Sequence, residues 1–155
     1  MSDGQDPAAV TGGCQCGAVR YALRSEPTGA GICHCRMCQT AFGNFFGAFA
    51  GVPKADLVWT RGEPGVFRSS EAAERGFCRD CGTPLTFRYR ESSHISVSIG
   101  SLDAPEGIRP EIQYGIESRL PAFENLHVLP GERMEDAVTP EDLVRMSSRQ
   151  HPDHD

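Results

Sequence analysis

The sequence predicts a mainly β domain of short strands with little helix, and three observations carry this prediction. Several segments alternate apolar and polar residues with a period of two, the pattern of a strand with one buried face. The chain contains 17 glycines and 11 prolines, more than the average usage of about 7% and 5% would supply. These residues mark turns between short elements. Finally, a complete helix-start signal occurs at a single place, near residue 139.

The first half of the chain predicts four strands and one helical turn. The clearest strand alternates Val19, Tyr21 and Leu23 with smaller or polar neighbours. Residues 36–42 are expected to form a short helical turn. The four predicted strands cover residues 18–23, 44–52, 57–60 and 65–69.

The second half predicts three more strands and a terminal helix. In the segment around residue 97, Ile95, Val97 and Ile99 alternate with serines, which indicates one apolar face. Thr139 followed by Pro140 predicts a helix start, because threonine caps the first turn and proline fits the first helical position. The three predicted strands cover residues 85–90, 95–99 and 112–116.

The length of 155 residues predicts one folded domain with flanking segments. A small, polar stretch opens the chain, and we expect a flexible leader over residues 1–11. The folded body is expected over residues 12–135. A C-terminal helix and a frayed tail are expected over residues 136–155.

Composition and charge exclude several classes of function. The net charge is -6 and Lys54 is the one lysine, so the clustered cations that bind nucleic acid are missing. No apolar run approaches the roughly 18 residues of a membrane span. The first residues have neither a basic nor an apolar segment of a secretory signal. We therefore expect a cytoplasmic protein with no nucleic-acid or membrane partner.

All seven cysteines fall into three short groups. Cytoplasmic thiols stay reduced, so grouped cysteines there indicate metal binding or catalysis. A C-x-C pair in extended chain presents both sulfurs on one face, and a C-x-x-C closes a tight turn around a metal. A glycine after such a pair allows the left-handed conformation that this turn needs. The groups are Cys14-Gln15-Cys16-Gly17, Cys33-His34-Cys35-Arg36-Met37-Cys38 and Cys78-Arg79-Asp80-Cys81-Gly82.

Zinc prefers four tetrahedral ligands in a structural site and three protein ligands with an open position in a catalytic site. The two outer groups together supply four thiolates: Cys14, Cys16, Cys78 and Cys81. The central group then supplies three: Cys33, Cys35 and Cys38. Two other partitions remain open at this point. In one of them Cys33 and Cys35 complete the closed site with Cys14 and Cys16. In the other, Cys33 and Cys35 form a ribbon-like site with Cys78 and Cys81.

These motifs, in this order and spacing, resemble the glutathione-dependent formaldehyde-activating enzyme family, also called the centromere-protein-V-like family. The resemblance extends from Gly12 to about Pro130. It implies an Mss4-like, β-tent zinc-binding fold with two Zn²⁺ per chain. It also implies the first partition, with a structural zinc on the outer cysteines and a catalytic zinc on Cys33, Cys35 and Cys38. The stretches that carry it are residues 13–21, 33–38 and 77–85.

The resemblance implies a zinc-dependent carbon–sulfur lyase that makes or breaks a thiol–aldehyde adduct such as S-hydroxymethylglutathione. Its partners would be a glutathione-like thiol and an aldehyde. Three thiolates lower the Lewis acidity of zinc, so we expect thiol handling rather than hydroxide generation. The alternative is a non-catalytic zinc module that binds another protein, since a fold does not determine a function. His34 lies between two expected ligands and is either an acid–base group, an alternative ligand or a loop residue that points away.

Overall fold

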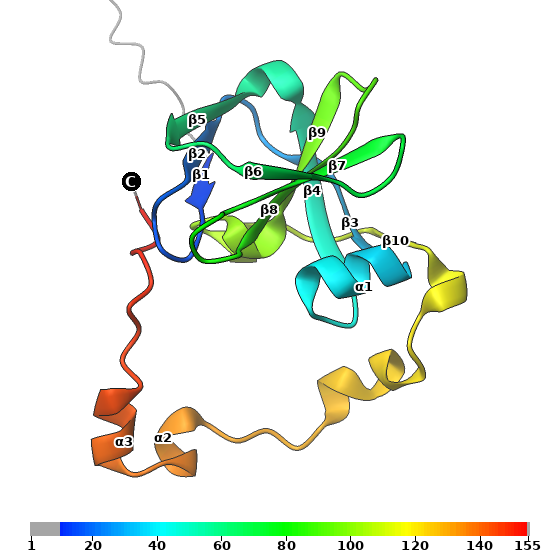
Figure 1. The fold of residues 1–155 in the computed structure, drawn as a ribbon. Helices are drawn as coiled ribbons and strands as arrows, with labels where there is room; N and C mark the ends of the chain where they lie inside the picture. Colours follow the sequence, from blue (N-terminus) through cyan, green and yellow to red (C-terminus); the bar gives the residue numbers. More distant parts are fainter. Residues whose placement is uncertain (1–9, 155) are drawn as a thin grey trace, which may run out of the picture.

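The structure of the protein is a computed structural model that describes residues 10–154. Its strands form two sheets (Figure 1). The smaller sheet has the order β1-β2-β5 and consists of β1 (Val10–Gly13), β2 (Arg20–Leu23) and β5 (Leu57–Arg61). The larger has the order β10-β3-β4-β9-β8-β7-β6 and consists of β3 (Thr28–Cys33), β4 (Gly47–Pro53), β6 (Gly65–Arg68), β7 (Ala73–Phe77), β8 (Pro84–Tyr89), β9 (His94–Ser98) and β10 (Ile112–Tyr114).

Helices are few and short, so the predicted mainly β class is confirmed. The α-helices are α1 (Arg36–Phe42), α2 (Met134–Ala137) and α3 (Pro140–Arg145). Single turns of 3₁₀ helix cover Lys54–Asp56, Ile99–Ser101, Pro105–Gly107 and Ile116–Ser118, and a longer 3₁₀ segment covers Pro121–Val128. In residues 10–154 none of these helices is long and apolar enough to cross a membrane.

Every predicted strand exists in the structure, with bounds shifted by a few residues. Three further strands, β1, β3 and β7, were not predicted. The pairing is antiparallel throughout, except that β10 runs parallel to β3. This parallel pair brings the segment after residue 112 alongside the strand that ends at Cys33.

The main core lies between the two sheets. Tyr21 and Leu23 of β2 pack with Val52 of β4, Leu85 of β8 and Val97 of β9, all of them buried. The inward positions of the alternating strands supply these side chains, as their period of two predicts. The Tyr21 hydroxyl is satisfied by the Ser101 hydroxyl at 2.7 Å, and burial raises the pKa of Tyr21.

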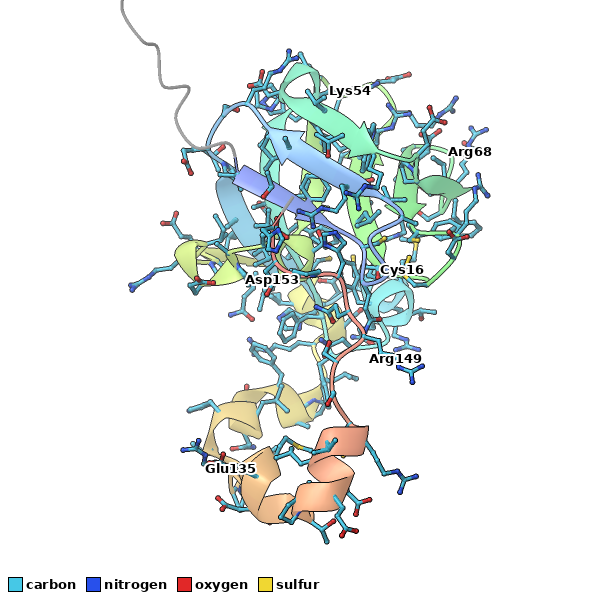
Figure 2. All side chains as sticks on the ribbon, turned by 90° about the vertical axis from the view of Figure 1, so that its left-hand side faces the viewer. Cys16, Lys54, Arg68, Glu135, Arg149 and Asp153 are labelled. Carbon is cyan, nitrogen blue, oxygen red and sulfur yellow. The ribbon has the colours of Figure 1, made fainter. Side chains whose placement is uncertain are left out.

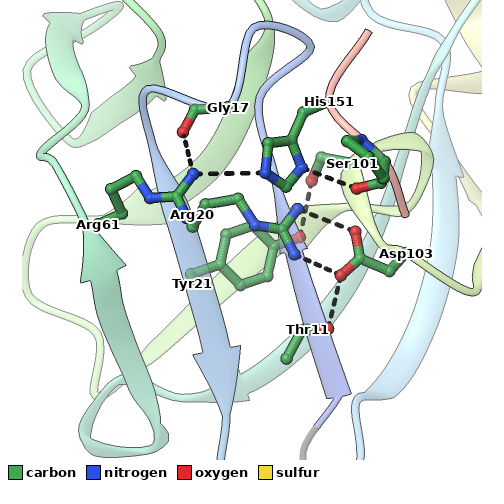
Figure 3. Close-up of polar contacts among 9 residues, drawn as sticks. Thr11, Gly17, Arg20, Tyr21, Arg61, Ser101, Asp103 and His151 are labelled. Carbon is green, nitrogen blue, oxygen red and sulfur yellow. Dashed lines mark hydrogen bonds and ion pairs between the residues drawn. The ribbon is translucent and has the colours of Figure 1, made fainter. Parts of the chain in front are cut away.

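A buried ion pair joins the smaller sheet to the segment after β9. The Arg20 guanidinium donates to both carboxylate oxygens of Asp103, at 2.9 Å to Oδ1, and the Thr11 hydroxyl donates to Oδ2 at 2.6 Å (Figure 3). Burial alone would raise the pKa of Asp103, but these donors outweigh it and hold the pKa below its ordinary value. The pair therefore fixes β1 and β2 against the end of the larger sheet.

The C-terminal part leaves the sheets as an extended arm and then returns. Figure 2 shows Glu135 on this arm, apart from the sheets, and Asp153 back beside them. Thr139 caps α3, accepting from the Asp142 backbone N–H at 3.2 Å, as predicted.

The tail beyond residue 149 makes specific contacts with the body of the protein, and the frayed end expected there stays a prediction. The His151 backbone N–H donates to the Gln15 carbonyl at 2.8 Å, and its imidazole lies 3.3 Å from an Arg61 nitrogen (Figure 3). A backbone hydrogen bond and a side chain against the Cys14–Gly17 loop hold this segment in place. At the other end, β1 starts at Val10, inside the expected leader, and residues 1–9 of that leader lie outside the described residues. The boundary expected at residue 135 falls within α2 and stays a prediction.

Candidate metal centres and the adjoining cavity

The two outer cysteine groups meet in one cluster. The turn after β1 carries Cys14 and Cys16, and the turn between β7 and β8 carries Cys78 and Cys81. All four sulfur atoms lie within 4.8 Å of one another. The Sγ–Sγ distances are 3.6 Å from Cys14 to Cys16 and 3.7 Å from Cys16 to Cys78. A tetrahedral zinc with bonds of about 2.3 Å requires sulfur separations of about 3.8 Å, so the four thiols fit such an ion.

Two similar turns shape this four-cysteine cluster. Gly17 and Gly82 follow their cysteines with φ of 78° each, the left-handed conformation that the sequence predicts there. The Val19 backbone N–H donates to the Cys14 sulfur at 3.2 Å. Hydrogen bonds from the backbone to sulfur favour the thiolate form that a metal needs.

Thr83 connects the two turns to each other. Its hydroxyl lies 3.2 Å from the Cys81 sulfur and accepts from the Gln15 backbone N–H at 3.0 Å. Burial opposes ionisation of Cys81, but the hydroxyl and backbone N–H of Thr83 outweigh it and lower the pKa of this thiol to about 6. One side chain thus stabilises a charged sulfur and holds the neighbouring turn.

The central cysteines form a second cluster at the junction of β3 and α1. Cys33 ends β3, Cys35 is the N-cap of α1, and Cys38 lies in its first turn. Their sulfur atoms also lie within 4.8 Å of one another, and no fourth His, Cys, Asp or Glu of residues 10–154 lies within that distance of all three. The Cys35 sulfur accepts from the Cys38 backbone N–H at 3.4 Å. The cluster therefore offers three soft ligands and lacks a fourth. This is the ligand count of a zinc centre with an open coordination position.

Neighbouring segments hold this three-cysteine cluster in shape. The His34 backbone N–H donates to the Tyr114 carbonyl of β10 at 2.9 Å. The Gln39 amide of α1 donates to the carbonyls of His34 and Ser118, at 2.6 and 3.0 Å. The long-range pairing of β10 with β3 therefore positions the cysteines.

The imidazole of His34 points away from the cysteines and is fully buried. Its Nε2 lies 2.8 Å from the Gln113 amide oxygen. The centre of its ring lies 4.7 Å from the ring centre of Phe123, in an edge-on arrangement, and 6.1 Å from that of Phe46. His34 supplies no atom to the three-cysteine cluster. Of the roles considered, the structure places it as a side chain that points away, although packed in the interior rather than in a loop at the surface.

A cavity of about 410 Å³ adjoins the three-cysteine cluster. Cys33, Cys35 and Cys38 lie on its wall. The remaining wall comes from α1, the strands of the larger sheet and the segment between β6 and β7, with aromatic side chains from β4, β8 and β10. The large side chains that line the cavity, apart from the cysteines, are Met37, Phe49, Arg75, Phe87, Tyr89 and Tyr114.

Arg75 of β7 is a residue that the sequence analysis did not single out. Its Nη2 donates to the Cys38 sulfur at 3.5 Å, and its guanidinium lies 5.0 Å from the centre of the Phe87 ring. The side chain is buried, and among residues 10–154 it forms no ion pair with a carboxylate. Burial raises the pKa of Cys38 to about 12, although Arg75 acts in the opposite direction.

A hollow of about 370 Å³ next to the four-cysteine cluster is lined by Arg20, Asp103 and His151. There the cysteines already supply four ligands, and the polar side chains are engaged with each other. Within residues 10–154, the three-cysteine cluster is the place where an incomplete ligand set meets a cavity with room for a small molecule.

The two sheets and the two cysteine clusters define a class of small β-rich proteins that can hold two metal ions. Within this class the chain belongs to the glutathione-dependent formaldehyde-activating enzyme family, whose profile matches residues 9–118. This confirms the family to which the sequence motifs point.

A lyase of Schizosaccharomyces pombe, itself uncharacterised, is 36% identical over 78 residues. The match covers 50% of this chain and 56% of the yeast protein, so it spans little more than half of that relative. The crystal structure of a Rhodobacter sphaeroides protein superposes with a TM-score of 0.53 at 26% identity, covering 67% of this chain and 98% of that one.

Proposed function

We propose that this protein is a zinc-dependent carbon–sulfur lyase that makes or breaks a thiol–aldehyde adduct such as S-hydroxymethylglutathione. Cys14, Cys16, Cys78 and Cys81 would hold a structural zinc, and Cys33, Cys35 and Cys38 a catalytic one. Membership of the family supports the reaction class, as does the name of the yeast relative. The observation that carries the proposal is the three-thiol cluster on the wall of a cavity.

Cys33, Cys35 and Cys38 would hold this zinc, and the bound ion would supply the Lewis acidity that lowers the pKa of a substrate thiol. The protein's own residues prepare that site. The Cys38 backbone N–H fixes the Cys35 sulfur, and Arg75 places a positive charge beside Cys38. This cation offsets part of the negative charge that three thiolates bring to a buried centre.

The proposed reaction is balanced without any redox partner. In the forming direction the thiol gives up its proton, and the sulfur lone pair forms a bond to the aldehyde carbon. The carbonyl π electrons move to the oxygen, which then takes a proton from solvent. In the lyase direction the hydroxyl loses its proton, the carbon–sulfur bond breaks, and its electron pair leaves with the sulfur.

A reducing compartment is part of the proposal. All seven cysteines are free thiols in the structure, and such thiols persist in the cytoplasm. The net charge of -6 leaves small molecules, rather than nucleic acid, as the proposed partners.

The test combines zinc stoichiometry with exchange kinetics. Native mass spectrometry is expected to find about two zincs in the wild type and about one in Cys35→Ser, with an unchanged circular dichroism spectrum. Exchange spectroscopy by NMR on glutathione and formaldehyde is expected to show accelerated adduct formation with the wild type and loss of that acceleration with Cys35→Ser. Thr40→Ser, an exposed change on α1, is the matched control.

Two results would contradict the proposal in different ways. Failure of the two-zinc wild type to accelerate adduct formation or breakdown for any thiol would remove the lyase activity. A three-cysteine cluster that binds no metal even after reconstitution would favour the non-catalytic binding module instead.

A further inference from the structure

The cavity beside the three-cysteine cluster is much larger than the smallest aldehyde requires. Its volume of about 410 Å³ lies in the range of about 300–1,000 Å³ that is typical of sites for larger organic ligands. A hydroxymethyl group has one carbon and one oxygen, and it fills only a small part of such a space. The size alone therefore points to a bulkier substrate group.

The wall of the cavity is aromatic on several sides. Phe87 meets Phe49 at 5.9 Å and Tyr89 at 5.2 Å between ring centres, so the three rings form one continuous surface. Tyr114 and Met37 continue it on the side of the cysteines, and both are exposed, as is Tyr89. Exposed aromatic and methionine side chains around a cavity are typical of a surface that an apolar ligand covers.

Charge in the cavity is scarce. Arg75 is the one charged side chain on its wall, and it already donates to the Cys38 sulfur. Glutathione carries two carboxylates and an ammonium group, which this wall cannot pair. The peptide part of such a thiol would therefore lie toward the open rim, and the aldehyde-derived part would occupy the cavity.

The cavity offers few polar groups to a ligand oxygen. Arg75 contributes guanidinium N–H donors on the same wall as the three cysteines. Ser69 and Ser70 also line the cavity, but the Ser69 Oγ is itself buried. Arg75 is therefore the donor to which a single ligand oxygen would turn.

We propose that this cavity selects thiol adducts whose aldehyde-derived carbon carries a bulky apolar group, an aromatic ring above all. The ring packs on Phe87 and Tyr89, and the adduct oxygen faces Arg75. The inference rests on the proposed lyase function and narrows its substrate class to thiohemiacetals of apolar aldehydes. The bonds made and broken are those described above for the thiol and the carbonyl carbon.

The test uses two unreactive thioethers that differ in one group, S-benzylglutathione and S-methylglutathione. Isothermal titration calorimetry on the full zinc-loaded chain is expected to show roughly tenfold or more tighter binding of the benzyl compound. Tyr89→Ala is expected to reduce this ratio severalfold without affecting the fold, because Tyr89 is exposed. Phe87→Leu is the second variant. Phe45→Ala, an aromatic truncation outside the cavity, should leave the ratio unchanged.

Three other results of this titration would each contradict a specific part of the proposal. Equal binding of the two thioethers by the wild type would overturn the inference and leave the lyase proposal standing. A benzyl preference that survives both Tyr89→Ala and Phe87→Leu would also overturn it, since another surface would then be responsible. Absence of binding by either thioether would contradict the proposed glutathione adduct as well.

Discussion

The guanidinium of Arg75 lies 3.5 Å from the sulfur of Cys38, and it is buried without a carboxylate partner among residues 10–154. An unpaired buried cation is costly, so its retention here requires an anion close by. When Cys38 holds a metal ion as proposed, its thiolate would be that anion. We therefore expect Arg75 to act on the three-cysteine cluster through Cys38, in addition to the donor that it offers to an adduct oxygen in the cavity.

Replacing Arg75 tests this relationship. A hydrogen bond to a charged group contributes about 1.5–3 kcal/mol, so Arg75→Gln is expected to lower kcat/KM for adduct breakdown by roughly 10- to 100-fold. Arg75→Lys, which keeps the charge, should recover part of the loss. The control is Arg88→Gln, whose side chain pairs with Glu74 at 2.7 Å outside the cavity.

A readout beyond activity separates positioning from mere packing. In cobalt-substituted protein the thiolate charge-transfer bands should shift on Arg75→Gln and return toward the wild-type position with Arg75→Lys. Unchanged bands alongside reduced activity would rule out an effect exerted through Cys38.

The Arg20–Asp103 pair predicts a pH-dependent contribution to stability. Exposure of the two side chains is only 3% and 12%, and breaking such a pair costs about 3 kcal/mol or more. Because the folded-state pKa of Asp103 is lowered, the unfolded state binds a proton more readily in acid. The contribution is thus complete above the unfolded pKa of about 3.9 and is lost as pH falls through the lower folded value.

The measurement compares thermal unfolding of the wild type and Asp103→Asn between neutral pH and about pH 3. The two melting temperatures should differ most at neutral pH and converge in acid. Metal loss in acid affects both proteins, so the difference between them isolates the pair. Glu141→Gln, an exposed acid on α3, is the control. A difference that does not change with pH would contradict the assignment.

Gly17 predicts a second stability effect, this time at the four-cysteine cluster. Its φ is 78°, and an added Cβ would lie 2.3 Å from Cδ2 of His151. Gly17→Ala is expected to destabilise the fold by about 1–2 kcal/mol from backbone strain, and further through the clash. The double variant Gly17→Ala/His151→Ala should regain only the part of the unfolding free energy that is lost through the clash. Gly131→Ala, where the added atom meets nothing within 4 Å, should be neutral.

The two clusters are expected to lose metal at different rates. The three-cysteine cluster faces a cavity and has three ligands, whereas the other has four. A chromophoric chelator should therefore release zinc in two phases, with the fast phase absent in Cys35→Ser. A single phase of unchanged amplitude in that variant would show that the fast zinc does not come from the three-cysteine cluster.

The sequence predicts the parts of this fold that rest on local patterns. Ile95 and Val97 alternate with serines and form a strand, and the cysteine groups gather into the two clusters that the family resemblance implies. The role of these cysteines as zinc ligands stays a prediction. The return of His151 to Gln15 was not foreseen, since a single polar contact leaves no pattern.

Of the three strands that were not predicted, β3 and β7 were missed for identifiable reasons. In β3 the sequence Thr-Gly-Ala-Gly-Ile-Cys has no large alternating side chains, and Gly31 allows close approach of β10. In β7, Glu74 and Arg75 are adjacent charged residues, which suggests a surface loop. In the structure Glu74 forms an ion pair with Arg88, and Arg75 lies beside Cys38. Arg75 was missed because its partner is a sulfur rather than a carboxylate.

The four-cysteine cluster also joins distant parts of the chain, since Cys16 and Cys78 are separated by 62 positions. A metal ion bound to both would close that loop as a covalent cross-link does, and would remove conformational freedom from the unfolded chain. For a loop of this length the chain-entropy estimate is about 4 kcal/mol. The cluster would thus provide, in a compartment where thiols stay reduced, the entropic constraint that secreted domains of this size obtain from a disulfide.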